Sequence, residues 1–396
     1  MLYTFEGIQN RYTMKAKNVI QSLMSMAGIE INGNRPFDVQ IHDERTYQRW
    51  LAEAEMGLGE SYMDGWWDCD ALDQLINKIL LAHLDQKIKR NFRTALFVLS
   101  TKIFNQQTKS KATVVGKRHY DLGNELFSRM LDPYMNYSCG YWQTASHLNN
   151  AQLAKLDLIC RKLQLKPGMK VLDLGCGWGG FAKYAAQNYG VEVVGVTISK
   201  NQAQFAKTFC KGLPIEIHLM DYRDVTGNFD AVVSIGFFEH VGYKNYGTYM
   251  KVVDRCLKEE GISLLHTIGN NTSLTYVNGW TNKYIFPYGM IPSMAQIAKA
   301  AEPFFVIEDV HNFGPDYDKT LMAWYANFEK AWPDLKDQYD ERFYRMWRYY
   351  LLSSAGGFRS RFNQLWQFVM TKPGRKQPET RFPNESSVLP DGGQSG

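Results

Sequence analysis

From His119 onward, short apolar runs alternate with longer segments whose apolar residues recur every three or four positions. The runs are MKVLDLG, VEVVGVTIS, IEIHLMD, FDAVVSIGF and ISLLHTIG, and the segments between them include GFAKYAAQNYG, NQAQFAKTFC and YGTYMKVVDRCLKEEG. Runs of valine, isoleucine and leucine are typical of buried parallel strands, and the segments are typical of amphipathic helices. The pattern predicts an α/β fold with a parallel, doubly wound sheet.

A different pattern precedes this alternation. Two helical stretches, AKNVIQSLMSMAG and RTYQRWLAEAEMG, flank the extended PFDVQIHD, and the aromatic GLGESYMDGWWDCD follows. We therefore expect a small, helix-rich α+β domain over residues 1–85, a basic linker over residues 86–115 and the α/β domain over residues 116–372. Residues 373–396 contain Pro, Gly and Ser and little that could pack, which predicts a disordered tail.

Composition narrows the class of protein. The chain has 396 residues, of which 45% are hydrophobic and 21% charged, as in ordinary globular proteins. No run approaches the ~20 apolar residues of a spanning helix, and the first residues lack an apolar signal core, so we expect a cytoplasmic protein. The cysteines form no CxxC pair and the histidines show no ligand spacing, which indicates reduced thiols and argues against a zinc site.

The positive charge is concentrated in one block. The net charge is only +5, yet the stretch from Gln86 to Arg118 holds nine lysines and arginines and no acidic residue. Because the block also contains the apolar ALFVLSTKIF, it is amphipathic. Three interpretations stay open from composition alone: a solvated helix face, a site for nucleic acid, or a site for an anionic membrane surface.

The strongest single motif is VLDLGCGWGG, residues 171–180, where a strand runs into a glycine-rich turn and then a helix. Glycines let the backbone approach a ligand at the carboxyl edge of the sheet. Asp173 lies on the strand before the turn, where it can meet an ammonium group but would repel a phosphate. The motif therefore favours S-adenosylmethionine over a dinucleotide, and a plain tight turn is the alternative.

The second strand departs from the usual nucleotide-binding pattern. Such strands commonly end in Asp or Glu for the ribose hydroxyls, whereas Thr197 stands at that place here. Gln202, at the start of the next helix, can supply the missing polar contacts. Alternatively, Thr197 and Gln202 only help to cap that helix, as Ser199 also can.

A carboxylate and a histidine follow the apolar run in SIGFFEHVG, residues 234–242. Adjacent side chains on a strand point in different directions, so Glu239 and His240 are not expected to serve one atom together. We assign a structural role to His240 and regard Glu239 as a candidate catalytic group, because a buried carboxylate gains basicity.

Several motifs occur together in a fixed order. They are HYDLGNELF, YSCGYW, VLDLGCGWGG, GVTISKNQ, DYRD, FEHVG, LLHTIG and YDKTLMAWY, with GLGESYMDGWW in the N-terminal part. This set resembles the bacterial cyclopropane fatty acid synthase family over essentially the whole chain. The resemblance implies a class I S-adenosylmethionine-dependent methyltransferase, which methylates a cis double bond in a membrane phospholipid acyl chain and closes a three-membered ring.

The resemblance also implies site residues and partners. It implies a homodimer that associates peripherally with the inner face of the cell membrane and binds bicarbonate as the base. The bicarbonate ligands would be Cys139, Glu239, His266, the backbone of Ile268, and Tyr317. The donor, S-adenosylmethionine, would be bound by Tyr137, Ser138, Asp173, Gly175, Gly177, Thr197, Gln202, Asp221 and Tyr222.

Alternatives to this assignment remain at the level of the sequence. Glu239 or His266 could be the direct base, and Cys139 could be a thiol nucleophile, although alkylation of an alkene offers no acyl group to hold. A nucleic-acid methyltransferase would usually carry a proline pair after the fourth strand, which GFFEHVG lacks. A non-catalytic lipid-binding protein would not need the donor turn. Within enzymes, the runner-up is a lipid methyltransferase that leaves a methyl branch or methylene group.

Overall fold

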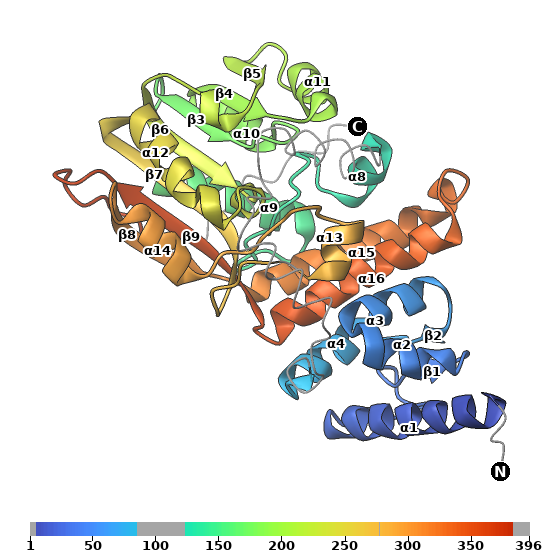
Figure 1. Cartoon of the computed structure of the whole chain (residues 1–396). Coiled ribbons are helices and arrows are strands. Elements are labelled where there is room, and N and C mark those ends of the chain that lie inside the picture. Colours follow the sequence, from blue (N-terminus) through green and yellow to red (C-terminus); the bar gives the residue numbers. More distant parts are fainter. Residues whose placement is uncertain (1–4, 85–122, 277, 383–396) are drawn as a thin grey trace.

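A seven-stranded sheet organises the larger part of the molecule (Figure 1). The computed structural model describes residues 5–84, 123–276 and 278–382. The strand order is β5-β4-β3-β6-β7-β9-β8. The strands are β3 (Lys170–Leu174), β4 (Glu192–Thr197), β5 (Ile215–Leu219), β6 (Phe229–Ile235), β7 (Leu257–Asn270), β8 (Val306–Asn312) and β9 (Asn363–Thr371).

The order of the strands places a ligand site. From β3 the chain winds outward to β4 and β5, and it then returns to lay β6 and β7 on the other side of β3. The order of the strands therefore reverses between the neighbouring strands β3 and β6. Ligands of such sheets bind outside the carboxyl ends of the strands at this topological switch point. The five strands predicted from the apolar runs are β3 to β7, and their pairings are parallel as predicted.

The sheet is not parallel throughout, because β9 runs antiparallel to both β7 and β8. Two long helices, α15 (Pro315–Leu335) and α16 (Glu341–Arg359), connect β8 to β9. They have similar lengths and pack on each other as a hairpin, so they return the chain to the edge of the sheet that it left. A strand that starts there must run in the opposite direction to β8.

One predicted boundary is wrong. The segment YGTYMKVVDRCLKEEG was expected to be helical to Gly261, but α12 (Tyr246–Cys256) ends earlier and β7 begins at Leu257. Leu257 pairs with Phe229, and the regular register resumes only at Ile262 opposite Ala231. The charged residues between these pairs form an irregular start to a buried strand, which their polarity did not indicate.

Helices cover both faces of the sheet. Val171 of β3 lies in one apolar cluster with Leu156, whereas its neighbour Leu172 lies in another with Met250 of α12. The strand alternation thus separates two cores. The remaining elements of this part are α8 (Asn124–Met130), α9 (Leu148–Lys162), α10 (Gly180–Tyr189), α11 (Lys200–Phe209), α13 (Gly279–Tyr284), α14 (Met294–Ala301) and the short turns η2 (Tyr222–Asp224), η3 (Phe238–His240) and η4 (Tyr243–Asn245).

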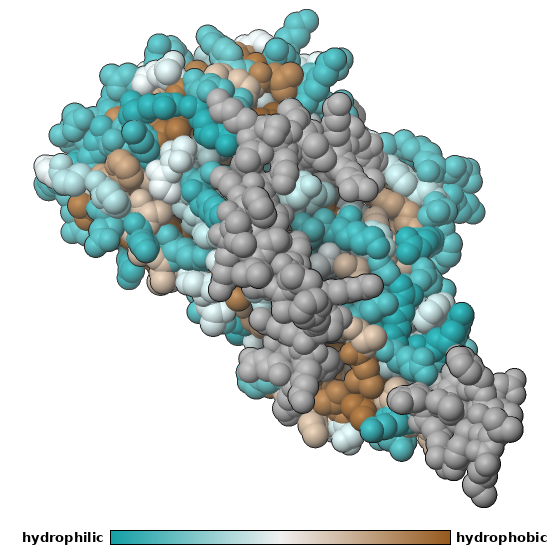
Figure 2. All heavy atoms as spheres, viewed as in Figure 1, coloured by the Kyte–Doolittle hydropathy of each residue, from teal (hydrophilic) through white to brown (hydrophobic). Residues whose placement is uncertain are grey.

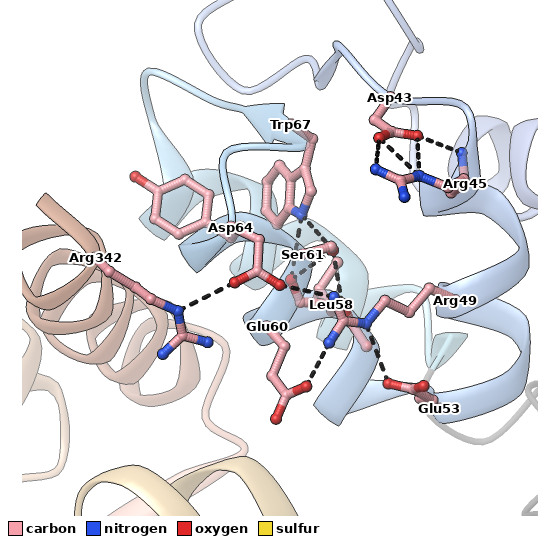
Figure 3. Close-up of polar contacts among 12 residues, drawn as sticks. Asp43, Arg45, Arg49, Glu53, Leu58, Glu60, Ser61, Asp64, Trp67 and Arg342 are labelled. Carbon is pink, nitrogen blue, oxygen red and sulfur yellow. Dashed lines mark hydrogen bonds and ion pairs between the residues drawn. The ribbon is translucent and has the colours of Figure 1, made fainter.

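The N-terminal part is a small α+β unit, as predicted (Figure 1). Its two short strands pair antiparallel. Trp67 is fully buried and meets Trp50 edge to face at 5.4 Å, and its indole N–H donates to Ser61 (Figure 3). The elements are α1 (Phe5–Met26), β1 (Gln40–Ile41), α2 (Arg45–Glu53), α3 (Glu55–Met63), β2 (Trp67–Asp68) and α4 (Leu72–Leu81).

Helix α16 joins the two parts, and one apolar cluster runs from the N-terminal helices through α15 and α16 to residues 126–139. At its rim, Arg342 donates to Asp64 (Figure 3), and Arg345 donates to Asp68. A side chain on Gly59 would lie 2.4 Å from the ring of Trp280 of α13, so this contact requires glycine. The α+β unit is therefore packed on the helices that lead into β9.

Two predicted segments lie wholly or partly outside the described residues. These are the basic linker over residues 86–115 and the part of the predicted tail beyond residue 382. Residues 373–382, which we expected to be disordered, instead contact the α/β domain: Thr380 is buried, Arg381 donates to Asp309 of β8 at 2.8 Å, and Phe382 stacks under Arg161. The buried carboxylate of Asp309 and the guanidinium of Arg161 thus hold residues 373–382 in place, although this segment contains few apolar side chains.

Candidate active site

A pocket opens at the carboxyl ends of β3, β4 and β6, where the switch point predicts a ligand. Its walls come from the segment before α9, the turn after β3, the start of α11 and the turn η2. All nine residues expected to bind the methyl donor line it: Tyr137, Ser138, Asp173, Gly175, Gly177, Thr197, Gln202, Asp221 and Tyr222.

The glycine-rich turn forms the floor of this pocket. Gly175 and Gly177 have φ angles of 82° and 54°, in the left-handed region that glycine adopts without strain. A Cβ atom on Gly175 would also lie 2.5 Å from the side chain of Phe237. The turn therefore needs glycine both for its backbone angle and for the close approach of Phe237, which lines the same pocket.

Thr197 and Gln202 lie together at the end of β4. The hydroxyl of Thr197 donates to the side-chain oxygen of Gln202 at 3.0 Å, and both residues are buried. Ser199 caps α11 by accepting from the backbone N–H of Gln202. Thr197 also accepts from the backbone N–H of Ser199 at 3.2 Å. All three residues line the pocket, so the capping contacts and the pocket wall are built from the same short segment.

Asp221 and Tyr222 form the far wall. Both carboxylate oxygens of Asp221 accept from Arg223, at 2.7 and 2.6 Å. Tyr222 is buried against the edge of Phe237, and burial raises the pKa of its hydroxyl to about 12. Arg223 is a site residue that is not among those expected from the sequence, although an acid two positions before an arginine in a turn is a recognisable signal for this pairing.

Asp173 is buried at the back of the pocket. Its side chain is 2% exposed, and its Oδ2 atom has no hydrogen-bond partner within the described part of the chain. Burial raises the pKa of the carboxyl to about 7, and the positive charge of Lys155 opposes the rise. An unpartnered buried acceptor in a pocket fits a ligand ammonium group, as the sequence predicts.

His240 lines the same pocket, which differs from the purely structural role expected for it. Its Nδ1 atom is buried and has no partner among the described residues, and its ring lies 5.7 Å from that of Phe286. Burial lowers the pKa of the imidazole to about 4, so the ring is neutral near neutral pH. The turn η3 rotates His240 toward the pocket and Glu239 away from it.

Glu239 lies behind the pocket, against β7. Its Oε1 atom accepts from the backbone N–H of Ile268 at 2.7 Å, whereas its buried Oε2 atom has no partner within the described residues. Burial raises the pKa of the carboxyl to about 7, and the bond from Ile268 acts in the opposite direction. The structure thus brings these two predicted residues together, and the N–H expected to face an anion is bound to Glu239.

His266 stands two residues before Ile268 on the same strand and is 1% exposed. The side-chain amide nitrogen of Gln367, opposite it on β9, lies 3.3 Å from Nδ1. In the tautomer that lets this amide donate, Nδ1 accepts and the ring proton is on Nε2. Burial, with the charges of Lys155 and Lys162, holds its pKa well below the usual range. The result is a neutral imidazole whose Nε2 has no partner in the described residues.

Cys139 and Tyr317 lie in the apolar cluster that joins the two parts. The Cys139 thiol donates to the carbonyl of Gly140 at 3.1 Å and lies 3.9 Å from the hydroxyl of Thr320, one turn after Tyr317 on α15. Burial raises the pKa of Cys139 well above its usual range, which leaves a neutral thiol. Tyr317 is buried against Phe358, with ring centroids 4.5 Å apart.

Comparison with known proteins places these features in a family. Residues 106–368 match the model of the family described as mycolic acid cyclopropane synthetase. The chain is 56% identical over 354 residues to the cyclopropane-fatty-acyl-phospholipid synthase of Escherichia coli strain K12. The aligned region covers 89% of this chain and 93% of the relative.

Solved structures show the same fold. The mycolic acid cyclopropane synthase CmaA1, complexed with SAH and CTAB, is 32% identical with a TM-score of 0.62, over 66% of this chain and 98% of that one. The cyclopropane synthase MmaA2 from Mycobacterium tuberculosis is 31% identical with a TM-score of 0.63, over 68% and 100% of the two chains. The predicted class I methyltransferase fold, preceded by a small α+β unit, is confirmed.

Proposed function

The chain belongs to the mycolic acid cyclopropane synthetase family of S-adenosylmethionine-dependent methyltransferases, and on that premise we propose that it cyclopropanates phospholipids. In this reaction it moves the donor methyl group to a cis double bond of an acyl chain and closes a ring. The observation that carries the proposal is the pairing of a complete donor pocket with a buried, half-satisfied carboxyl on Glu239, the residue before His240 of the pocket wall. A methyltransferase that only alkylates an amine or hydroxyl needs no second group to take a proton from carbon.

The reaction has two parts that balance. The π electrons of the alkene form a bond to the donor methyl carbon while the carbon–sulfur bond breaks, and its electrons stay on sulfur to give S-adenosylhomocysteine. The alkene becomes a carbocation. A proton then leaves the transferred methyl group, and the electrons of that C–H bond close the ring.

The carbocation needs stabilisation in a dry site. Tyr137 lines the donor pocket and packs with Trp324 and Phe286, at centroid distances of 5.2 and 6.3 Å. Its hydroxyl shares a 2.9 Å hydrogen bond with that of Tyr350 of α16, which fixes the ring. Aromatic faces attract a cation by up to ~2 kcal/mol per desolvated contact, so this wall suits the intermediate.

Two buried polar atoms behind the donor pocket support the proposal of a site for a small anion. Oε2 of Glu239 and Nε2 of His266 are buried without partners in the described residues, and they have complementary roles as acceptor and donor. We infer that they hold bicarbonate, which supplies the base that accepts the methyl proton. A carboxyl with a pKa near 7 can share a proton with such an ion, so we propose that Glu239 orients the base. Cys139 and Tyr317, which lie in the apolar cluster that joins the two parts, are proposed as its further ligands.

Features of the molecular surface support a lipid substrate and contact with a membrane. Among the helices that the structure describes, none combines the length and apolar character of a membrane-spanning segment. Large apolar side chains are exposed on the N-terminal helices at Met14, Val19, Met26 and Leu81, and Figure 2 shows a hydrophobic patch at that end of the molecule. We propose that the N-terminal unit secures the lipid, that the basic linker docks on an anionic bilayer from the cytoplasmic side, and that the enzyme is a homodimer.

The proposed activity is tested by identifying the chemical structure of the lipid product. The protein is incubated with S-adenosylmethionine and vesicles of a cis-unsaturated phospholipid, and the acyl chains are analysed by mass spectrometry and proton NMR. We expect the mass of one CH2 group to be added, with the upfield signals of ring protons. Vinylic signals of a methylene group would instead support the runner-up, and methyl transfer to a headgroup would overturn the proposal. Vesicles with saturated chains are the control.

A further inference from the structure

Lys155 of α9 is a fully buried lysine to which the sequence assigns no role in the site. Its ammonium donates to the side-chain oxygen of Asn136 at 2.8 Å and to the hydroxyl of Ser138 at 3.1 Å. Both of these residues line the donor pocket. Burying an ammonium group costs free energy unless it is bonded, so these contacts must stabilise it in place.

Helix α9 holds the segment before it at several points. Gln152, one turn before Lys155, donates to the carbonyl of Ser138 at 2.8 Å, and the backbone N–H of Tyr141 donates to the carbonyl of Ala151. A side chain on Gly140 would lie 2.9 Å from Cβ of Ala151. The segment that contributes Ser138 to the donor pocket is therefore fixed along one face of α9.

Asp173 faces the same helix. Alternate residues of a strand share a face, and Val171, two residues earlier, packs in one cluster with Leu156 and Ile159 of α9. Asp173 thus points to the side of the sheet from which Lys155 projects. The positive charge of Lys155 acts on Asp173, and the negative charge of Asp173 acts on Lys155.

Apart from Asp132, the titratable groups around this pair are neutral. Asp132 is the second carboxyl that acts on Lys155, and it already accepts from the backbone N–H groups of Tyr134 and Asn136 and from the Asn136 amide. The neutral groups are the thiols and rings whose pKa values burial moves away from neutrality: Cys139, Cys176, Cys210, Tyr249 and His266. Asp173 and Asp132 are therefore the two carboxyl groups near Lys155, and burial raises the pKa of both.

We propose that Lys155 is a positioning residue for the methyl donor. It fixes Asn136 and Ser138 on one side of the pocket and supplies the positive charge that favours the ionised form of Asp173 on the other. Asp173 can then accept from the ammonium group of S-adenosylmethionine. The inference rests on the proposed donor site and adds a residue that touches neither the donor nor the lipid.

The experiment compares two buried lysines of one helix. Lys162 is 1% exposed, lies two turns after Lys155, and pairs with Asp309 and His311 of β8, away from the pocket. Donor affinity of the full chain is measured by calorimetry from about pH 6 to about pH 9, for wild type, Lys155→Met and Lys162→Met. Thermal unfolding shows that each variant is folded.

We expect Lys155→Met to weaken donor binding by about 10-fold or more near neutral pH and Lys162→Met to change it less than about 3-fold. The ratio of variant to wild-type dissociation constants should fall as the pH rises, because Asp173 ionises in the variant while Lys155 loses its proton in wild type. This ratio cancels the titration of the donor itself.

A double-mutant cycle separates positioning from general damage. In an Asp173→Asn background, Lys155→Met should weaken binding far less than it does alone. Equal losses in both backgrounds, a ratio independent of pH, or equal effects of the two lysine variants would overturn the inference. If wild type binds no S-adenosylmethionine, the proposed function fails, whereas normal wild-type binding with an unaffected Lys155→Met sinks only this inference.

Discussion

The backbone N–H of Ile268 holds one oxygen of the Glu239 carboxylate at 2.7 Å and leaves the other buried and unpartnered within the described residues. A carboxyl tethered in this way has one orientation. Its remaining oxygen is available to a ligand, and its pKa near 7 allows it to accept or donate a proton at little cost. This arrangement is the reason for treating Glu239 as an orienting group and not as an ordinary buried acid.

The raised pKa of Glu239 predicts a pH-dependent stability. Between the ordinary value of 4.5 and about 7, the folded protein keeps this proton and the unfolded chain releases it. The free energy of unfolding should therefore fall as the pH rises through this window, by up to about 1.4 kcal/mol per pH unit from this group. Urea unfolding of wild type and Glu239→Gln checks it: the difference between the two curves should follow this slope, and a difference that does not vary with pH would contradict it.

The glycine turn predicts a specific loss of donor binding. Gly175→Ala places a methyl group against Phe237 in addition to the strain of a positive φ, so donor affinity should fall by more than roughly 10-fold. Gly168→Ala is the matched control, because Gly168 also has a φ angle of 82° but nothing within 4 Å of the added Cβ. Calorimetry should find near-normal binding for the control, and equal losses in both variants would attribute the effect to backbone strain alone.

Cys139 should tolerate serine. Its thiol is neutral and hydrogen-bonded to a carbonyl, so a hydroxyl can replace it, and turnover should fall by roughly 10- to 100-fold without vanishing. Cys256→Ser, at another fully buried thiol beside a backbone carbonyl, controls for the cost of burying a hydroxyl. Intact-protein mass spectrometry during turnover provides the second readout. A covalent adduct at Cys139, or a folded, donor-binding Cys139→Ser enzyme with no activity, would refute this role.

The basic linker should bind anionic bilayers. Each lysine or arginine near such a surface contributes ~1 kcal/mol, screened by salt. Vesicle sedimentation should show weaker binding as ionic strength rises, and weaker binding after replacing Lys87, Lys89, Arg90 and Arg93 by Gln. The control replaces four exposed lysines of the α/β domain: Lys207, Lys211, Lys251 and Lys299. Binding that responds to neither salt nor the linker variant would count against the proposed docking.

The donor pocket could be predicted from the sequence because its parts are local. Asp173, Gly175 and Gly177 belong to one strand and turn, and parallel strands bring Thr197 and Asp221 to the same edge. Apolar runs also indicated β3 to β7 correctly. Such features depend on the spacing of apolar residues along the chain and on the residue types that favour turns, and both can be read from a single sequence.

The remaining features depend on tertiary contacts that no local pattern encodes. Lys155 lies on the apolar face of α9, four residues after Ala151 and four before Ile159, and only the burial of that face turns its ammonium toward Asn136. The antiparallel β9 follows from the helical hairpin before it. Likewise, the turn η3, not a continuing strand, points His240 into the pocket, so the alternation argument for FEHVG did not apply.

In the proposed mechanism, Glu239 fixes the ion that removes the methyl proton. The measurement is turnover against added bicarbonate in carbonate-depleted buffer, for wild type and Glu239→Gln, with donor affinity taken by calorimetry. We expect wild type to depend on bicarbonate, and the variant to lose roughly 10- to 150-fold in rate with donor affinity almost unchanged, since a hydrogen bond to a charged group contributes ~1.5–3 kcal/mol. Wild-type turnover that is indifferent to bicarbonate, together with an inactive Glu239→Gln, would show that Glu239 is itself the base.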